Sequence, residues 1–142
     1  MSRKKIVVII SVIVIVFSVI CSVLPLITSG ELAEKTVIST FGETVTLYGK
    51  GLYARNSVSG AVQAIAQDMV TLFMIVPGMI AALLMIRKGR VIGMFLLTGL
   101  FGYMLYTYMS YAFLMFYNDL FLLYVINMTL KGEVLMMTIL KR

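Results

Sequence analysis

A small set of polar side chains lies inside long apolar segments, and these are the residues whose types could support chemistry. Polar groups in such segments are costly unless they pair within a helix bundle, so they indicate either a binding site or structural hydrogen bonds. We expect them to form one polar, tyrosine-rich patch in the outer half of a bundle. The candidate patch consists of Gln63, Gln67, Asp68, Tyr103, Tyr106, Ser110, Tyr124, Asn127 and Lys131.

Asp68 is the acidic member of this patch. It lies 18 residues before Ile86, the last apolar residue of its segment. That separation is about 27 Å along a helix, close to the edge of a ~30 Å hydrocarbon core. We therefore expect Asp68 at the membrane interface in a local structural role, with a ligand or proton site as the alternative.

One helix face carries Tyr124, Asn127 and Lys131, because Asn127 follows Tyr124 by three residues and Lys131 follows Asn127 by four. A lysine stem can reach toward the headgroups, so we expect Lys131 to extend to the cytoplasmic interface rather than pair inside the bundle. A direct pair with Asp68 is not expected, since roughly 8–10 Å of depth separates the two residues. Tyr108 and Tyr111 are predicted to belong to an aromatic belt at the outer interface.

Several reaction classes lose their central residues in this sequence. The chain has no His, no Trp and one cysteine, Cys21. An intramolecular disulfide, a C-x-x-C pair and a thiolate zinc site are thereby excluded, and histidine-based catalysis lacks its base. The 12 Met residues have no His beside them, so they are interpreted as apolar filling rather than a copper site. We predict no catalytic residues, no metal site and no cofactor.

The composition indicates an integral membrane protein. The 142 residues are 61% hydrophobic and 13% charged, with a mean hydropathy of +1.05. Soluble domains are typically ~45–50% apolar and ~25% charged. The sequence therefore predicts an all-α integral membrane fold, a single four-transmembrane-helix bundle with a small β-hairpin or meander in its first extracytoplasmic loop.

Four apolar segments are long enough to be membrane spans, at residues 6–27, 61–86, 91–116 and 120–140. The first is too long for the apolar part of a signal peptide. The fourth is interrupted by Lys131-Gly132-Glu133, so an incomplete span is the alternative. In the second, Pro77-Gly78 predicts a kink, interpreted as static rather than as a moving hinge.

The basic residues predict the orientation. They cluster at residues 3–5, 87–90 and 141–142, with no acidic residue among them, and all three clusters fall on one side of a four-span arrangement. Positive charge is enriched in cytoplasmic loops, so we expect a plasma-membrane protein with both termini cytoplasmic. This distribution accounts for the net charge of +6 and disfavours nucleic-acid binding.

The connection at residues 28–60 is the only long polar segment. It contains β-rich runs at residues 36–40 and 44–48, and a shorter run at 52–55 follows Gly49-Lys50-Gly51. Branched residues bounded by glycines are typical of a small antiparallel hairpin or meander.

Several segments together resemble a group of uncharacterised multi-pass membrane proteins of bacteria and archaea. The resemblance covers about Gly42 to Val125, and it implies a plasma-membrane location with no assigned activity. From Ile126 onward the chain departs from the plain apolar last span of that group. The segments are Tyr48-Gly49-Lys50-Gly51-Leu52-Tyr53, Asn56-Ser57-Val58-Ser59-Gly60-Ala61, the run from Gln63 to Asp68, Tyr103-x-x-Tyr106-x-Tyr108-x-Ser110-Tyr111, and the run from Tyr117 to Val125.

These observations predict a non-catalytic accessory or interaction subunit. Its expected partners are the lipid bilayer and another membrane protein or a second copy of the chain. The alternative is a small transporter or ligand sensor that uses the polar patch. An enzyme with Asp68 and a tyrosine as its acid and base is a third, weaker interpretation, because no nucleophile or metal cluster accompanies them.

Overall fold

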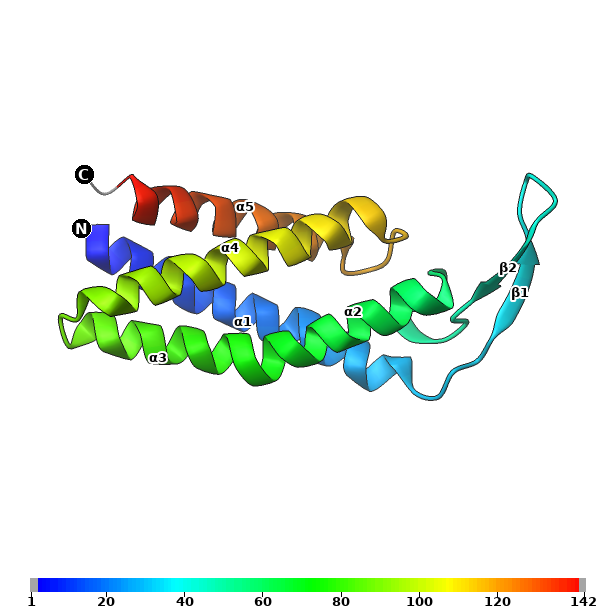
Figure 1. Ribbon diagram of the computed structural model, residues 1–142, viewed down its shortest axis with the longest axis horizontal. Helices are drawn as coiled ribbons and strands as arrows, with labels where there is room; N and C mark the ends of the chain where they lie inside the picture. Colours follow the sequence, from blue (N-terminus) through cyan, green and yellow to red (C-terminus); the bar gives the residue numbers. More distant parts are fainter. Residues whose placement is uncertain (1–2, 141–142) are drawn as a thin grey trace.

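Long apolar runs satisfy their backbone hydrogen bonds internally when they form helices, and helices dominate this protein. The computed structural model describes residues 3–140. It contains four helical segments that are long and apolar enough to cross a membrane, and one small antiparallel sheet (Figure 1). The predicted four-helix architecture with a hairpin is confirmed at this level. The segments are Lys5–Ser29, Val58–Arg87, Val91–Leu114 and Phe121–Ile139.

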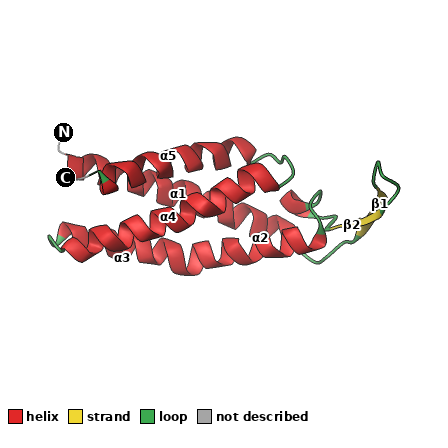
Figure 2. Ribbon diagram, turned by 45° about the horizontal axis from the view of Figure 1, so that its top comes forward, coloured by secondary structure: helices red, strands yellow, loops and turns green. Residues whose placement is uncertain are grey.

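The first and third segments are unbroken helices, α1 (Arg3–Ser29) and α4 (Val91–Leu114). The start of α1 and the end of α5 (Phe121–Ile139) lie at the same end of the bundle as the turn before α4, whereas the hairpin lies at the opposite end (Figures 1 and 2). We call these the basic end and the hairpin end. The predicted basic side chains of residues 3–4 and 141–142 lie outside the described side chains.

The second segment consists of α2 (Val58–Val70), the π-helical turn η2 (Thr71–Ile75) and α3 (Val76–Arg87). In η2 the Val76 amide donates to the Thr71 carbonyl, five residues earlier. The segment changes direction at this turn (Figure 1). The irregular turn therefore precedes Pro77-Gly78 instead of centring on them. The reason is that Pro77 has no amide hydrogen, so the residues before it must rearrange their hydrogen bonds.

The fourth segment forms α5 without interruption, through Lys131, Gly132 and Glu133. The fourth helix is therefore continuous, and the alternative that the interruption ends it early is wrong. Its 19 residues extend about 28 Å. Lys131 faces the interior of the bundle, and Glu133 is exposed on the opposite side of the helix.

One face of α1 is built from small side chains that recur every three or four residues. This spacing allows another helix to approach closely. The Ser11 hydroxyl donates to the Val7 carbonyl at 2.6 Å, so it needs no partner from another helix. The buried residues of this face include Val7, Ser11, Val14, Ser18, Cys21 and Ser22.

The sheet pairs β1 (Lys35–Ile38) with β2 (Thr44–Leu47), close to the two predicted runs. The third run is not a strand, because Gly51–Tyr53 forms a 3-10 turn, η1. Gly51 has a φ of 68°, and a Cβ atom there would lie 2.5 Å from the Thr28 carbonyl oxygen. The turn thus packs closely against the end of α1, which gives a hairpin rather than a three-stranded meander.

Candidate functional site

Asp68 is buried in the interior of the bundle, and its predicted depth near the edge of the hydrocarbon core stays a prediction. Its side chain is 1% exposed. The Tyr53 hydroxyl donates to Oδ2 at 2.6 Å, and the Tyr111 hydroxyl donates to Oδ1 at 3.0 Å. Asp68 is buried because it shares a helix face with Ala61 and Ala64, which pack inward and leave little room for water.

Tyr53 is one of the site residues that the predicted patch did not include. It belongs to η1 in the connection after the hairpin, yet its side chain is fully buried. Burial raises the pKa of the Tyr53 phenol well above its ordinary value, so the hydroxyl remains a hydrogen-bond donor at neutral pH. The sequence signal for a buried Tyr53 was an apolar and aromatic run beside glycines. The same pattern is typical of a strand, so it did not indicate that the side chain enters the bundle.

Tyr53, Tyr108, Tyr111 and Tyr124 form a buried aromatic cluster. Neighbouring ring centroids are 5.3 to 6.4 Å apart, mostly edge to face. Tyr108 and Tyr111 are 1% and 2% exposed, so the predicted interfacial belt at these residues is wrong. They occupy the interior face of α4, opposite Tyr124 of α5, where each ring covers its neighbours.

Lys131 is also buried, which makes the predicted extension to the headgroups wrong. Its side chain is 0% exposed, and Nζ lies 3.1 Å from the centroid of the Tyr108 ring. Within the described residues the ammonium has no hydrogen-bond partner and no ion pair with Asp68. The aromatic face is its principal polar contact, an arrangement that partly compensates a desolvated cation.

The contact between α1 and α5 adds further polar groups. Asn127 Nδ2 donates to the Cys21 sulfur at 3.4 Å. The two helices are antiparallel. Ser18 therefore lies about one turn closer to the basic end than Cys21, near the level of Lys131. The hydroxyls of Ser18 and Ser22 are buried without a partner among residues 3–140. We refer to the whole cluster as the polar core: Ser18, Cys21, Ser22, Tyr53, Asp68, Tyr108, Tyr111, Tyr124, Asn127 and Lys131.

The structure brings four of the nine predicted patch residues into the polar core, namely Asp68, Tyr124, Asn127 and Lys131. The other five lie outside it. Tyr103 and Tyr106 are 37% and 66% exposed, and the Ser110 hydroxyl donates to the backbone of its own helix. Gln63 is exposed and Gln67 is half-buried. The predicted inward orientation of Tyr103, Tyr106 and Ser110 was wrong because tyrosine and hydroxyl side chains occur on all sides of α4, which leaves no contrast to show which side packs inward.

An apolar layer closes the polar core on the side of the basic end. Val14, Phe101, Met104 and Val134 are all 0% exposed, and each lies closer to that end than the polar-core residues of its own helix. On the other side, the polar core is bounded by η1 and the hairpin end. The polar core therefore borders the hairpin end more closely than the basic end.

The chemistry available in the polar core is proton binding, cation binding or internal hydrogen bonding. A carboxyl group, four phenols and one amine can exchange protons or contact a cation. In the described part of the chain, no group of three or more His, Cys, Asp or Glu side chains is placed to hold a metal ion.

Together the fold and the polar core define a helical bundle with four candidate membrane spans and a buried ionisable centre. Comparison of the chain with protein families, curated proteins and solved structures finds no match.

Proposed function

We propose that the protein is a non-catalytic plasma-membrane protein that acts through contacts of its extracytoplasmic hairpin, with both termini cytoplasmic. The orientation is supported by the charges at the basic end, where Lys5, Arg87, Lys88 and Arg90 are all exposed. Cytoplasmic loops are enriched in such residues. The hairpin then lies on the outer side of the membrane.

The observation that carries this proposal is an anchored hairpin with exposed apolar side chains. Ile38 is 76% exposed and Phe41 is 92% exposed, and the hairpin extends beyond the helix ends (Figure 2). Large apolar side chains held in water in this way mark interaction sites. β1 pairs only with β2 in the described part of the chain, so its outer edge can accept a strand from a partner.

The base of the hairpin is attached to the bundle by specific contacts. The buried Tyr48 hydroxyl donates to the Gly30 carbonyl at 3.2 Å. Asn56 Oδ1 accepts from the Phe116 amide at 3.0 Å, which joins the connection to the end of α4. Since these contacts hold the hairpin in one orientation, a partner meets a preorganised surface.

Photo-crosslinking tests the hairpin contact. A photoreactive residue in place of Phe41 is expected to give one protein adduct in native membranes, whose mass identifies either a second copy or a different protein. The added change Ile38→Ser should abolish this adduct by removing the neighbouring apolar contact. The control replaces Val62, which is 52% exposed on α2 and should react with lipid. An absence of protein adducts at position 41, or equal adducts at both positions, would contradict the proposal.

A second candidate function is sensing of a small ligand or ion by the polar core. It is favoured by Lys131, an unpartnered buried amine, and by Tyr53, which joins the outer connection directly to Asp68. Intramembrane ionisable residues commonly mark functional sites. The apolar layer closes the polar core on the basic-end side, which supports sensing of a ligand from the hairpin end.

The single cysteine provides a test of this candidate. Cys21 is 0% exposed within the polar core, so a membrane-impermeant maleimide added from the outer side should label it slowly. Tyr53→Ala is expected to raise the labelling rate by about tenfold, because losing one buried hydrogen bond and its ring lowers the opening free energy by more than ~1.4 kcal/mol. Tyr117→Ala is the control, since Tyr117 is 64% exposed. Equal rates for the two variants would show that Tyr53 does not close the core.

A further inference from the structure

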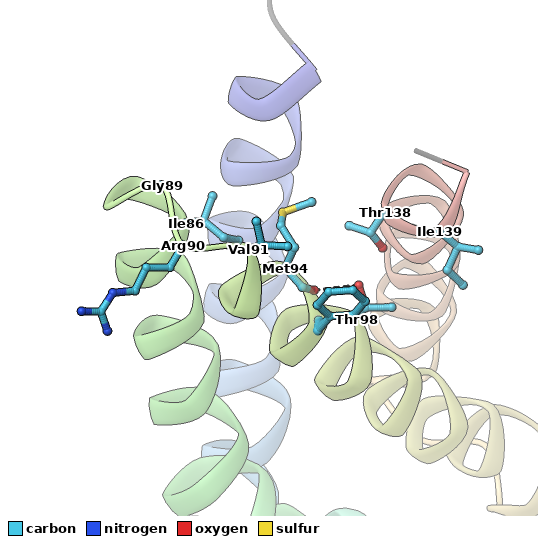
Figure 3. A pocket seen from close by; sticks show the side chains of 9 residues that line it. Ile86, Gly89, Arg90, Val91, Met94, Thr98, Thr138 and Ile139 are labelled. Atoms are coloured by element: carbon cyan, nitrogen blue, oxygen red, sulfur yellow. Dashed lines mark hydrogen bonds between the residues drawn. The ribbon is translucent and has the colours of Figure 1, made fainter. Parts of the chain in front are cut away.

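A cavity of about 470 Å³ lies at the basic end, far from the polar core. It is bounded by the turn between α3 and α4, the start of α4 and the end of α5 (Figure 3). Cavities of this size accommodate a small ligand or part of a lipid. Its walls include Ile86, Met94, Phe95, Thr98, Thr138 and Ile139.

The walls of the cavity are suited to hydrocarbon. The Thr98 hydroxyl donates to the Met94 carbonyl at 2.8 Å (Figure 3), and the Thr138 hydroxyl donates to the Val134 carbonyl at 3.0 Å. Both hydroxyls are thus used within their own helices, and their polar character toward the cavity is reduced. An apolar occupant therefore loses little by not forming hydrogen bonds here.

The cavity is continuous with a surface that faces outward from the bundle. Val91, Phe95 and Ile139 line it and are 69%, 73% and 62% exposed. In a membrane such apolar surfaces contact lipid tails, so an acyl chain can enter sideways between α4 and α5.

The rim of the cavity carries one cation, Arg90, and none of the cavity-lining residues is acidic. Lys88 is exposed two residues before Arg90 in the same turn, whereas Arg87 lines other pockets, between α1 and α3. Arg90 extends away from the cavity (Figure 3), as expected for a side chain that reaches to the headgroup level. Basic pockets between membrane helices are suited to anionic headgroups.

We propose that this cavity binds an anionic phospholipid, with one acyl chain between α4 and α5 and the phosphate near Arg90 and Lys88. The apolar walls account for the chain, and the cationic rim accounts for the preference for negative charge. The site is independent of the hairpin and of the polar core, so its test can fail without affecting the proposed function.

Thermal unfolding of the purified protein tests the lipid site. Cys21 is buried, so a thiol-reactive dye reports unfolding directly. Phosphatidylglycerol added to phosphatidylcholine nanodiscs is expected to raise Tm of the wild-type protein. Lys88→Gln with Arg90→Gln should weaken the apparent affinity for phosphatidylglycerol by at least about tenfold, since each cation near an anionic surface contributes. Thr98→Phe should also weaken it, by filling the space for the chain.

The controls distinguish binding of phosphatidylglycerol at this cavity from a general charge effect and from binding of phosphate alone. Lys50→Gln with Arg55→Gln removes the same charge at the hairpin end and should leave the phosphatidylglycerol effect unchanged. Inorganic phosphate at matched concentration should not raise Tm. The proposal is overturned if phosphatidylglycerol has no effect, if both double variants respond alike, or if phosphate alone reproduces the shift.

Discussion

Replacing Asp68 with alanine is expected to lower the free energy of unfolding by about 2–4 kcal/mol, the largest loss we predict for one side chain in the polar core. The change removes the acceptor of two buried phenol hydrogen bonds. Tyr111 keeps a second acceptor, the Ala64 carbonyl at 3.0 Å, whereas Tyr53 loses the one hydrogen bond of its hydroxyl seen within residues 3–140. The penalty thus falls mainly on Tyr53.

Denaturant unfolding in mixed micelles measures this loss, with Asp119→Ala as the control. Asp119 is exposed in the turn before α5, so its replacement should change stability by less than about 0.5 kcal/mol. A double-mutant cycle with Tyr53→Phe should give a coupling energy near 1 kcal/mol or more, because the two side chains share a hydrogen bond. Equal effects of Asp68→Ala and Asp119→Ala would contradict the buried position of Asp68.

Replacing Lys131 with methionine is expected to have the opposite sign, with a gain of about 1–3 kcal/mol in the free energy of unfolding. The Lys131 amine is fully buried over the Tyr108 ring, without a hydrogen-bond partner in the described chain. The cation–π contact of a desolvated cation returns about 2 kcal/mol or more, while desolvation of an ammonium costs several kcal/mol. Methionine has a similar length and packs favourably against aromatic rings.

The same micelle measurement, with Lys5→Met as the control, tests this sign. Lys5 is exposed, so its replacement should be nearly neutral. A loss of stability for Lys131→Met comparable to that for Asp68→Ala would show that the amine is held by a compensating group. That result would favour a structural role of the amine over the sensing function of the polar core.

These opposite signs bear on what the polar core does. A carboxyl group that satisfies two phenols stabilises the bundle, whereas an amine without a partner costs stability. Residues that are retained at such a cost are candidates for binding or switching. Loss of ligand response in Lys131→Met together with increased stability would therefore be the pattern typical of a functional residue.

The four helical segments and the hairpin were predictable from the sequence alone. Apolar runs of about 20 residues must satisfy their own backbone hydrogen bonds in lipid, so length and composition suffice to locate helices. The β-branched runs near Gly42 similarly predicted two strands, which the structure places at Lys35–Ile38 and Thr44–Leu47. These are local properties, since each depends on neighbouring residues and on the solvent.

Which face of each helix packs inward could not be predicted from the sequence. Along a soluble helix, polar residues mark the outside, but a membrane helix is apolar on both sides, and α4 shows how this misleads. Tyr106 and Tyr108 are only two residues apart, yet Tyr106 is 66% exposed to the outside and Tyr108 is 1% exposed. The serines of α1 likewise give no sequence signal that they face inward, although they line the buried face of this helix.

What the sequence by itself determined is therefore the set of helices, the hairpin and the clustering of basic residues, because hydrophobicity and chain length act locally. The tertiary structure decided that Tyr53 enters the bundle, that Tyr111 meets Asp68 across 43 positions, and that Lys131 turns inward to Tyr108. Such contacts join residues far apart in the chain, and they form because a polar group surrounded by apolar helices finds its partners only in other polar groups of the interior.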